Sequence, residues 1–245
     1  MRHLQNAPIT EAIIDFRIHP TKGFHIEKFL DFKAQLLSNY PVMEPRKLIE
    51  SRFEIKKGEP NIEITKREAP QGYWFKSSDG LEIVQFRVDG FTFNRLKPYT
   101  RWEDIFPKAW RLWETYTQSG AAEFVTRIAT RFINRLTFRT PVYDLATYLT
   151  TPPHTPEGIS GNIAGFLTRV VVNTPEKGLN ANITHALEEG TNRSSVVVIL
   201  DIDAYKQKQF EIGDSLLPTT FNSLHDLKNS IFFSTITEEA ARLFE

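Results

Sequence analysis

The chain of 245 residues contains no cysteine. Without cysteine it can have neither a disulfide framework nor a thiolate zinc site nor a cysteine nucleophile. Long apolar runs are also missing, since none approaches the roughly 20 residues that a membrane-spanning helix needs. The N-terminal residues lack the apolar stretch of a secretory signal. We therefore expect a globular cytoplasmic protein without membrane contact.

The chain also lacks net charge, because 30 lysines and arginines balance 30 aspartates and glutamates. Neutrality argues against a protein that binds nucleic acid through bulk positive charge. The zero is a cancellation, however: residues 1–140 hold 23 basic and 17 acidic residues, whereas residues 141–245 hold 7 and 13. The basic part could face the acidic part, or it could face an acidic partner.

Local catalytic signatures are absent. The sequence has no phosphate-binding GxxxxGK[ST] loop, no dinucleotide-binding GxGxxG and no GxSxG nucleophile motif. Its six histidines are scattered, with no HxH or HExxH pair. We therefore assign no catalytic residue, no metal ligand and no cofactor. An enzyme stays an open alternative, since catalytic groups can assemble from distant segments.

Apolar periodicity predicts both strands and helices. In the first part of the chain, patterns of period two predict strands over 12–18, 47–57, 61–68, 72–77 and 81–96, the last with a bulge or bend at Gly90. Helical patterns there predict helices over 26–39 and 102–117, the second ended by Gly120. Beyond it we expect strands over 123–139, 163–173, 179–189 and 194–205, and helical structure over 143–149 and 221–244.

These elements predict an α+β fold, in which helices pack on one side of a long, bent antiparallel sheet. The order of the elements also allows two similar halves, each reading strand, helix, several strands, helix. The halves would be residues 1–122 and 123–245, packed as one globular unit, with a proline-rich connection over 140–162.

The predicted strand 123–139 has two distinct faces. One face is apolar and carries Phe124, Ile128, Phe132, Leu136 and Phe138. The other face carries a row of arginines at intervals of about 13 Å: Arg127, Arg131, Arg135 and Arg139.

Arg87 and Arg95 would likewise share one face of the predicted strand 81–96, provided that Gly90 adds no bulge. The planar guanidinium suits carboxylate and phosphate groups. We therefore take five arginines as candidates for binding a partner or ligand: Arg87, Arg95, Arg127, Arg131 and Arg135.

The arginines admit two interpretations. On an exposed sheet face they could hold an anionic ligand, a protein partner, a nucleic-acid backbone or a second copy of the chain in a homodimer. They could instead form a ladder of cross-strand ion pairs with acids such as Asp89, Glu82 or Asp201, or simply be solvated. The sequence leaves both interpretations open.

Two further groups of residues have alternative roles. Asp201 and Asp203 would lie about 7 Å apart on one face of a strand. There they could hold a hard cation for a metal-assisted hydrolase, or they could pair with arginines. Five aromatic residues could stack on nucleic-acid bases or pack in the core, namely Tyr73, Trp74, Phe75, Phe91 and Phe93.

Three stretches carry a family resemblance. They are A-P-I-T-E-A-I at 7–13, L-K-P-Y at 96–99 with Trp102 after it, and R-I-A-T-R-F-I-N-R at 127–135. In this order they resemble a sporadically distributed family of uncharacterised bacterial proteins of similar length. The resemblance implies no activity or site. The patchy occurrence of the family suggests mobile genes, such as those of phage defence or toxin–antitoxin systems.

Within these stretches we expect structural roles. Glu11 could pair with an arginine such as Arg131, and Asn134 could satisfy backbone groups at a sheet edge. Taken together, we expect a non-enzymatic binding or regulatory protein that recognises a protein partner or an anionic ligand through the arginine-lined face. The alternatives are a nucleic-acid-binding protein and a metal-assisted hydrolase.

Overall fold

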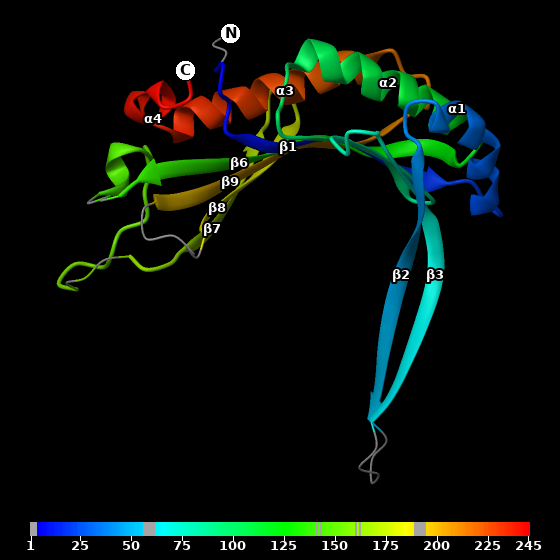
Figure 1. Cartoon of the computed structure of the whole chain (residues 1–245), viewed down its shortest axis with the longest axis horizontal. Helices are drawn as coiled ribbons and strands as arrows, with labels where there is room; N and C mark the ends of the chain where they lie inside the picture. Colours follow the sequence, from blue (N-terminus) through cyan, green and yellow to red (C-terminus); the bar gives the residue numbers. More distant parts are fainter. Residues whose placement is uncertain are drawn as a thin grey trace.

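A computed structural model of the chain describes residues 4–55, 62–140, 142, 144–159, 161, 163–188 and 195–245, with side chains at all of these except 48–55 and 62–69. The predicted α+β class with a large antiparallel sheet is confirmed. Figure 1 shows the sheet as an arch with the α-helices along its upper side, and one long hairpin that projects downward.

The described elements follow one another in two runs. The first run is β1 (Ile9–Pro20), the 3-10 helix η1 (Ile26–Phe32), α1 (Lys33–Leu37), β2 (Val42–Ile55), β3 (Ile62–Lys76), β4 (Glu82–Arg87), β5 (Gly90–Leu96) and α2 (Trp102–Gln118). The second run is β6 (Ala122–Arg139), the 3-10 helix η2 (Leu145–Thr147), β7 (Leu167–Thr174), β8 (Leu179–Leu187), β9 (Ser195–Phe210), α3 (Leu216–Thr235) and α4 (Glu238–Arg242).

Nine strands within the described residues form one open sheet in the order β2-β3-β4-β5-β1-β6-β9-β8-β7. Every neighbouring pair is antiparallel. β1 and β6 pair with each other near the centre of the sheet, so the seam joins segments that lie far apart in the sequence. α2 ends before Gly120, whose φ of +73° suits the predicted helix stop.

Residues 81–96 form a hairpin, and the single long strand predicted there is wrong. β4 ends at Arg87, the turn consists of Val88 and Asp89, and β5 begins at Gly90. Gly90 has a φ of +155°, and a Cβ there would overlap the carbonyl oxygen of Phe16 on β1. Asp89 followed by Gly90 between apolar runs is a signal for a turn, which the prediction of a bulge overlooked.

A bulge in β6 corrects a second prediction. The register of β6 shifts between Val125 and Arg127, against both of its neighbours. As a result Val125 is fully buried beneath the helices, whereas Phe124 is half-buried and stacks on His19, with the ring centroids 4.8 Å apart. The predicted apolar face therefore holds from Ile128 onward but not at Phe124.

Several boundaries also differ from prediction, and two of the differences change the number of elements. β3 runs without interruption from Ile62 to Lys76, where two strands were expected. The C-terminal helical region is divided into α3 and α4, because Ile236 leaves the helix to form a β-bridge with Leu149. The predicted strand ends at 57, 61, 189 and 194 lie outside the described residues.

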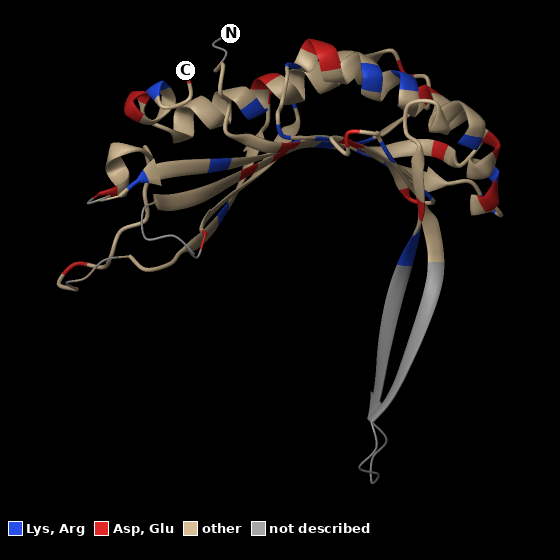
Figure 2. Cartoon of the chain, viewed as in Figure 1, with Lys and Arg blue, Asp and Glu red and all other residues tan. Residues whose placement is uncertain are grey.

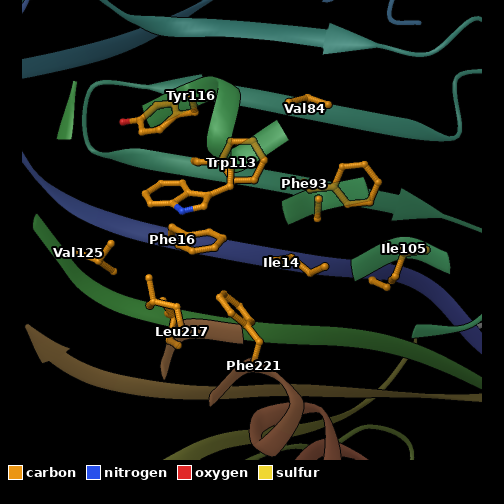
Figure 3. Close-up of a cluster of buried hydrophobic side chains, with 14 of the residues drawn as sticks. Ile14, Phe16, Val84, Phe93, Ile105, Trp113, Tyr116, Val125, Leu217 and Phe221 are labelled. Atoms are coloured by element: carbon orange, nitrogen blue, oxygen red, sulfur yellow. The ribbon is translucent and has the colours of Figure 1, made fainter. Parts of the chain in front are cut away.

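The main core lies between the sheet and the helices α2 and α3 (Figure 3). Phe16 of β1 stacks on Trp113 of α2 with ring centroids 4.0 Å apart, and it meets Phe221 of α3 at 4.8 Å. A second apolar cluster lies toward α4 and the end of α3, and it includes Phe138 and Phe232. We call the other side of the sheet the open face, since no described α-helix covers it (Figure 1).

Candidate functional site

All five candidate arginines form ion pairs. Three of these pairs join the basic part of the chain to its acidic part on the open face: Arg127 with Asp203, Arg131 with Asp201 and Arg135 with Glu188. Figure 2 shows the two signs of charge interspersed along the strands. The basic part thus faces the acidic part, which is one of the alternatives left open by the charge distribution.

Arg131 and Arg135 form the more exposed pairs. Nε of Arg131 donates to both carboxylate oxygens of Asp201, at 2.9 and 3.2 Å, and these hydrogen bonds raise the pKa of Arg131. Nε of Arg135 donates to Glu188 at 2.8 Å. The two arginine side chains are 46% and 44% exposed. Each pair is therefore worth only about 0.2–1 kcal/mol to stability and remains accessible to a partner.

Arg127 lies deeper in the same network. Its NH2 group donates to both oxygens of Asp203, at 2.9 and 2.8 Å, and its guanidinium lies 4.5 Å from the ring centroid of Tyr205. Asn182 of β8 donates to the same carboxylate at 3.1 Å and accepts from Arg169 of the edge strand β7 at 3.2 Å. The polar network thus extends from the centre of the sheet to one edge.

Asp15 of β1 continues the network across the seam. One of its oxygens accepts from Arg87 at 3.0 Å and from the hydroxyl of Thr92 at 2.7 Å, and the other accepts from Nε of Arg17 at 3.2 Å. NH1 of Arg127 lies 3.7 Å from the same carboxylate. Asp15 is 9% exposed and Arg87 is 4% exposed. Asp15 therefore neutralises a buried arginine, which gives Arg87 a structural role.

Replacing Asp15 with asparagine should lower the free energy of unfolding by about 2 kcal/mol, because the buried guanidinium of Arg87 loses charge compensation while Asp89 remains nearby. Urea denaturation followed by circular dichroism measures the change. Asp104→Asn is the matched control, since Asp104 is 49% exposed in its pair with Arg101. The control should lose about 0.5 kcal/mol or less, and equal losses would contradict the structural role.

Arg95 lies on the helix side of the sheet and does not share a face with Arg87. The hairpin turn reverses the alternation, so Arg95 pairs in register with Glu82. Oε1 of Glu82 accepts from Arg95 at 3.3 Å and from Lys108 of α2 at 2.6 Å, and Oε2 accepts from the hydroxyl of Tyr40 at 3.0 Å. Burial and the neighbouring Glu82 raise the pKa of Tyr40. These groups line a hollow of about 710 Å³.

Asp201 and Asp203 are both taken up by arginines, as described above. In the part of the chain that the structure describes, no group of three or more histidine or acidic side chains is arranged to hold a metal ion. A cation between these two carboxylates would face the guanidiniums of Arg127 and Arg131 at close range. The arrangement therefore favours the interpretation as ion pairs.

The five aromatic residues that could stack bases lie mostly inside the protein. Phe75, Phe91 and Phe93 are fully buried, and Tyr73 packs against the main core. Trp74 is half-buried, with Nζ of Lys76 5.7 Å from its ring centroid. Core packing, one of the two predicted alternatives, accounts for most of the set.

The residues of the resemblance stretches have mixed outcomes. Glu11 accepts a hydrogen bond from Asn94, rather than pairing with Arg131. Asn134 donates to the backbone carbonyls of Phe132 and Leu200 at 3.3 and 3.0 Å. The expected backbone role of Asn134 is thus present, but at the centre of the sheet rather than at an edge.

The sequence did not indicate a cavity of about 740 Å³ on the helix side, which we call the Lys228 cavity. Its walls come from residues 4–9, from residues 99–104 at the entry to α2, and from α3. All three resemblance stretches contribute to its lining, with Ala7, Pro8, Tyr99, Trp102 and Asn134. Segments that are far apart in the sequence therefore converge here.

Lys228 is the buried charged group of this cavity. It is 5% exposed, its Nζ donates to Oδ1 of Asn229 at 2.5 Å, and Nζ lies 3.9 Å from the ring centroid of Phe132. Among the described residues the contacts of Nζ are this amide and this ring, with no ion pair to a carboxylate. Burial lowers the pKa of Lys228 to about 7. A lysine in this state is poised between its charged and neutral forms.

His225 lies one helical turn before Lys228 on α3. Its ring stacks on Trp102 with centroids 4.5 Å apart, and its Nε2 lies 3.4 Å from Nδ2 of Asn229. Burial, together with the positive charge of Lys228, lowers the pKa of His225 to about 3. The imidazole is therefore neutral near pH 7.

A sequence signal for this site existed in α3. The buried positions of the helix recur every three or four residues, and they are Leu217, Phe221, Leu224, Lys228, Phe232 and Thr235. A lysine within an otherwise apolar stripe marks a buried cation, although nothing local shows what surrounds it.

Two comparisons with known proteins gave no match. No protein-family model matches the chain, and no curated protein shows significant similarity to it. Within the described residues, no helix combines the length and apolar character that crossing a bilayer requires.

Proposed function

We propose that the protein is a non-enzymatic binding or regulatory protein, which recognises a protein partner through the open face of its sheet. The observation that carries the proposal is the exposure of this charged network on a sheet face without a covering helix. The side chains of Arg131, Arg135 and Glu188 are 46%, 44% and 41% exposed. Interspersed charges of both signs give a protein partner complementary contacts and a defined register.

The same pairing weakens the case for nucleic acid. A phosphate backbone would have to compete with Asp201, Asp203 and Glu188 for the arginines, and those acids would repel it. The buried phenylalanines of β5 offer no platform for bases. A protein partner can place basic side chains opposite the exposed acids and acidic side chains opposite the arginines. It therefore avoids the repulsion and needs no aromatic platform.

A charge swap tests the proposal. In the double variant Arg135→Glu with Glu188→Arg the ion pair can re-form, so the melting temperature should stay within about 3 °C of the original value. The charges presented to a partner are nevertheless reversed. Proteins retained from a lysate of the producing cells by the immobilised wild type should therefore be lost by the swapped variant, as quantified by mass spectrometry.

Arg242→Glu is the control, because Arg242 is an exposed residue on α4, away from the open face. It should retain the same proteins as the wild type. Equal retention by the wild-type and swapped proteins, or no specific retention by either, would contradict the proposal. Salt-sensitive binding of a labelled single-stranded oligonucleotide would favour the nucleic-acid alternative instead.

We further infer that the chain comprises two similar halves that meet at the β1–β6 seam. Outward from the seam, β1 is followed by β5, β4, β3 and β2, and β6 is followed by β9, β8 and β7. In each direction the strand next to the seam leads into a long helix, α2 after β5 and α3 after β9. This order supports a division near residues 122 and 123.

A further inference from the structure

The Lys228 cavity has the dimensions of a small-molecule site. Its volume of about 740 Å³ falls within the roughly 300–1,000 Å³ typical of ligand pockets. The lining is mixed, and Leu4, Ile9, Phe232 and Phe233 form its apolar part. The polar part includes Asn134, Asn229 and His225 beside Lys228, together with charged side chains at the entry to α2. Apolar surface and polar groups are thus both available to an organic ligand that carries a charged group.

The unbalanced charge in this cavity belongs to Lys228. The side chain is 5% exposed, and its contacts are the neutral amide of Asn229 and the ring of Phe132. A buried ammonium without a counter-ion is costly, and the cost disappears when an anion pairs with it. Elsewhere in the protein, the buried Arg87 has Asp15 for this purpose. Lys228 has no equivalent among the described residues.

A second source of positive potential lies on the same wall. The helix α2 has 17 residues, and its N-terminal residues Trp102, Glu103 and Asp104 line the cavity. The N-terminus of a helix carries a partial positive charge that favours a bound anion. Asp104 is paired with Arg101 at 3.2 Å, whereas the carboxylate of Glu103, which also lines the cavity, opposes part of this potential.

We propose that the Lys228 cavity binds a small organic anion, whose carboxylate or phosphate group pairs with Lys228 while its aromatic or aliphatic body lies against the apolar walls. This site is on the opposite side of the sheet from the open face and does not depend on the function proposed there. All three resemblance stretches contribute residues to the walls of this cavity. Forming these walls is therefore a role that the three stretches share.

Binding of matched probes tests the proposal by isothermal titration calorimetry. Benzoate carries the anion, benzamide is its neutral isostere, and phenyl phosphate distinguishes a phosphate from a carboxylate. In the wild type at least one of the two anions should bind about tenfold or more tightly than benzamide. In Lys228→Met the preference for an anion should vanish. Lys22→Met, at an exposed position, should behave as the wild type.

A measurement on the wild type alone gives a second test. An anion stabilises the ammonium form of Lys228, so binding at pH 8 should take up protons, seen as a dependence of the heat on the ionisation enthalpy of the buffer. Besides Lys228, the charged or titratable groups of the lining are His225 on α3 and Tyr99, Arg101, Glu103 and Asp104 at the entry to α2. The lining residues of segment 4–9 and of β6 include none. Loss of the uptake in Lys228→Met assigns it to this lysine.

Several results would overturn the proposal. They are equal affinity of the wild type for benzoate, phenyl phosphate and benzamide, the absence of binding by either anion at about 10 mM, and an anion preference that persists in Lys228→Met. The charge-swapped variant of Arg135 and Glu188 should bind the probes as the wild type does. Failure of partner capture and failure of anion binding are therefore separate outcomes.

Discussion

Replacing Phe16 with alanine is expected to lower the free energy of unfolding by about 4 kcal/mol. Phe16 is fully buried at the point where the sheet meets both long helices. Its ring stacks on Trp113 of α2 at 4.0 Å and contacts Phe221 of α3 at 4.8 Å. Truncation therefore removes contacts with both helices at once. It leaves a cavity between β1, α2 and α3, which these elements can close only in part by moving toward one another. Urea denaturation followed by circular dichroism measures the loss.

Two control variants separate the position of Phe16 from the loss of an aromatic ring. Phe16→Leu keeps most of the buried volume and should cost about 1–2 kcal/mol. Phe124→Ala removes a half-buried ring on the other side of the β6 bulge and should cost about 1 kcal/mol. A loss for Phe16→Ala no greater than that for Phe124→Ala would contradict the central position of Phe16 in the core.

Lys228→Met is expected to raise the free energy of unfolding by about 3 kcal/mol at pH 7. Methionine has a similar length, and it removes the cost of burying an ammonium that has no carboxylate partner among the described residues. Some of the gain is offset by the lost contacts with Asn229 and Phe132. Lys22→Met should change stability by about 0.5 kcal/mol or less. A destabilised Lys228→Met variant would show that the lysine is compensated in the folded protein.

The stability of the wild type should also increase with pH, for the same reason. Burial lowers the pKa of Lys228 from 10.5 to about 7. Between these values the unfolded chain binds more protons than the folded one, so raising the pH from 7 to 9 should stabilise the fold by about 2 kcal/mol. The buried Tyr40 and Tyr116 have raised pKa values, and they destabilise the fold only above pH 10, where unfolded tyrosines ionise.

Denaturant titrations at pH 7, 8 and 9 measure this slope, and Lys228→Met should remove it. An identical slope in the variant would assign the pH dependence to other groups. Below pH 7 the stability should also increase with pH, because folding lowers the pKa of His225 from 6.5 to about 3. Stability should therefore decline as the pH falls from 6.5 toward 3, because the unfolded histidine takes up a proton that the folded one does not.

The elements that could be predicted from the sequence are those whose period is uninterrupted. α2 and most of β6 keep a single period between clear ends. The errors about which residues face the core fall where the alternation of buried and exposed positions changes phase. Across the turn at Val88 and Asp89, the residues that face the core change from even numbers in β4 to odd numbers in β5. In β6 the bulge after Val125 changes them from odd to even numbers. A phase shift of this kind depends on the register of the neighbouring strand, which one segment alone does not contain.

The candidate sites show the same limit. The spacing of Arg127, Arg131 and Arg135 was sufficient to place them on one face, and Asp201 was correctly named as a possible counter-ion. The spacing of residues could not identify Glu188 as the partner of Arg135. Glu188 follows β8, which is separated from β6 by β9, and this order of strands is not visible in the sequence. The Lys228 cavity is even harder to predict from the sequence, because three separate segments must be placed relative to one another before it exists.

The seam between β1 and β6 also affects how the chain is made. β1 pairs with β5 on one side, but its other edge stays unpaired until residues 122–139 have been synthesised and form β6. Leu217 and Phe221, which complete the apolar cluster around Phe16, come from α3, which follows the last strand. Until β6 has been synthesised, the nascent chain therefore carries an unpaired edge of β1 and an unfinished core, both of which favour association between nascent chains. A translation product that stops at residue 121, before β6, should accordingly aggregate rather than remain folded.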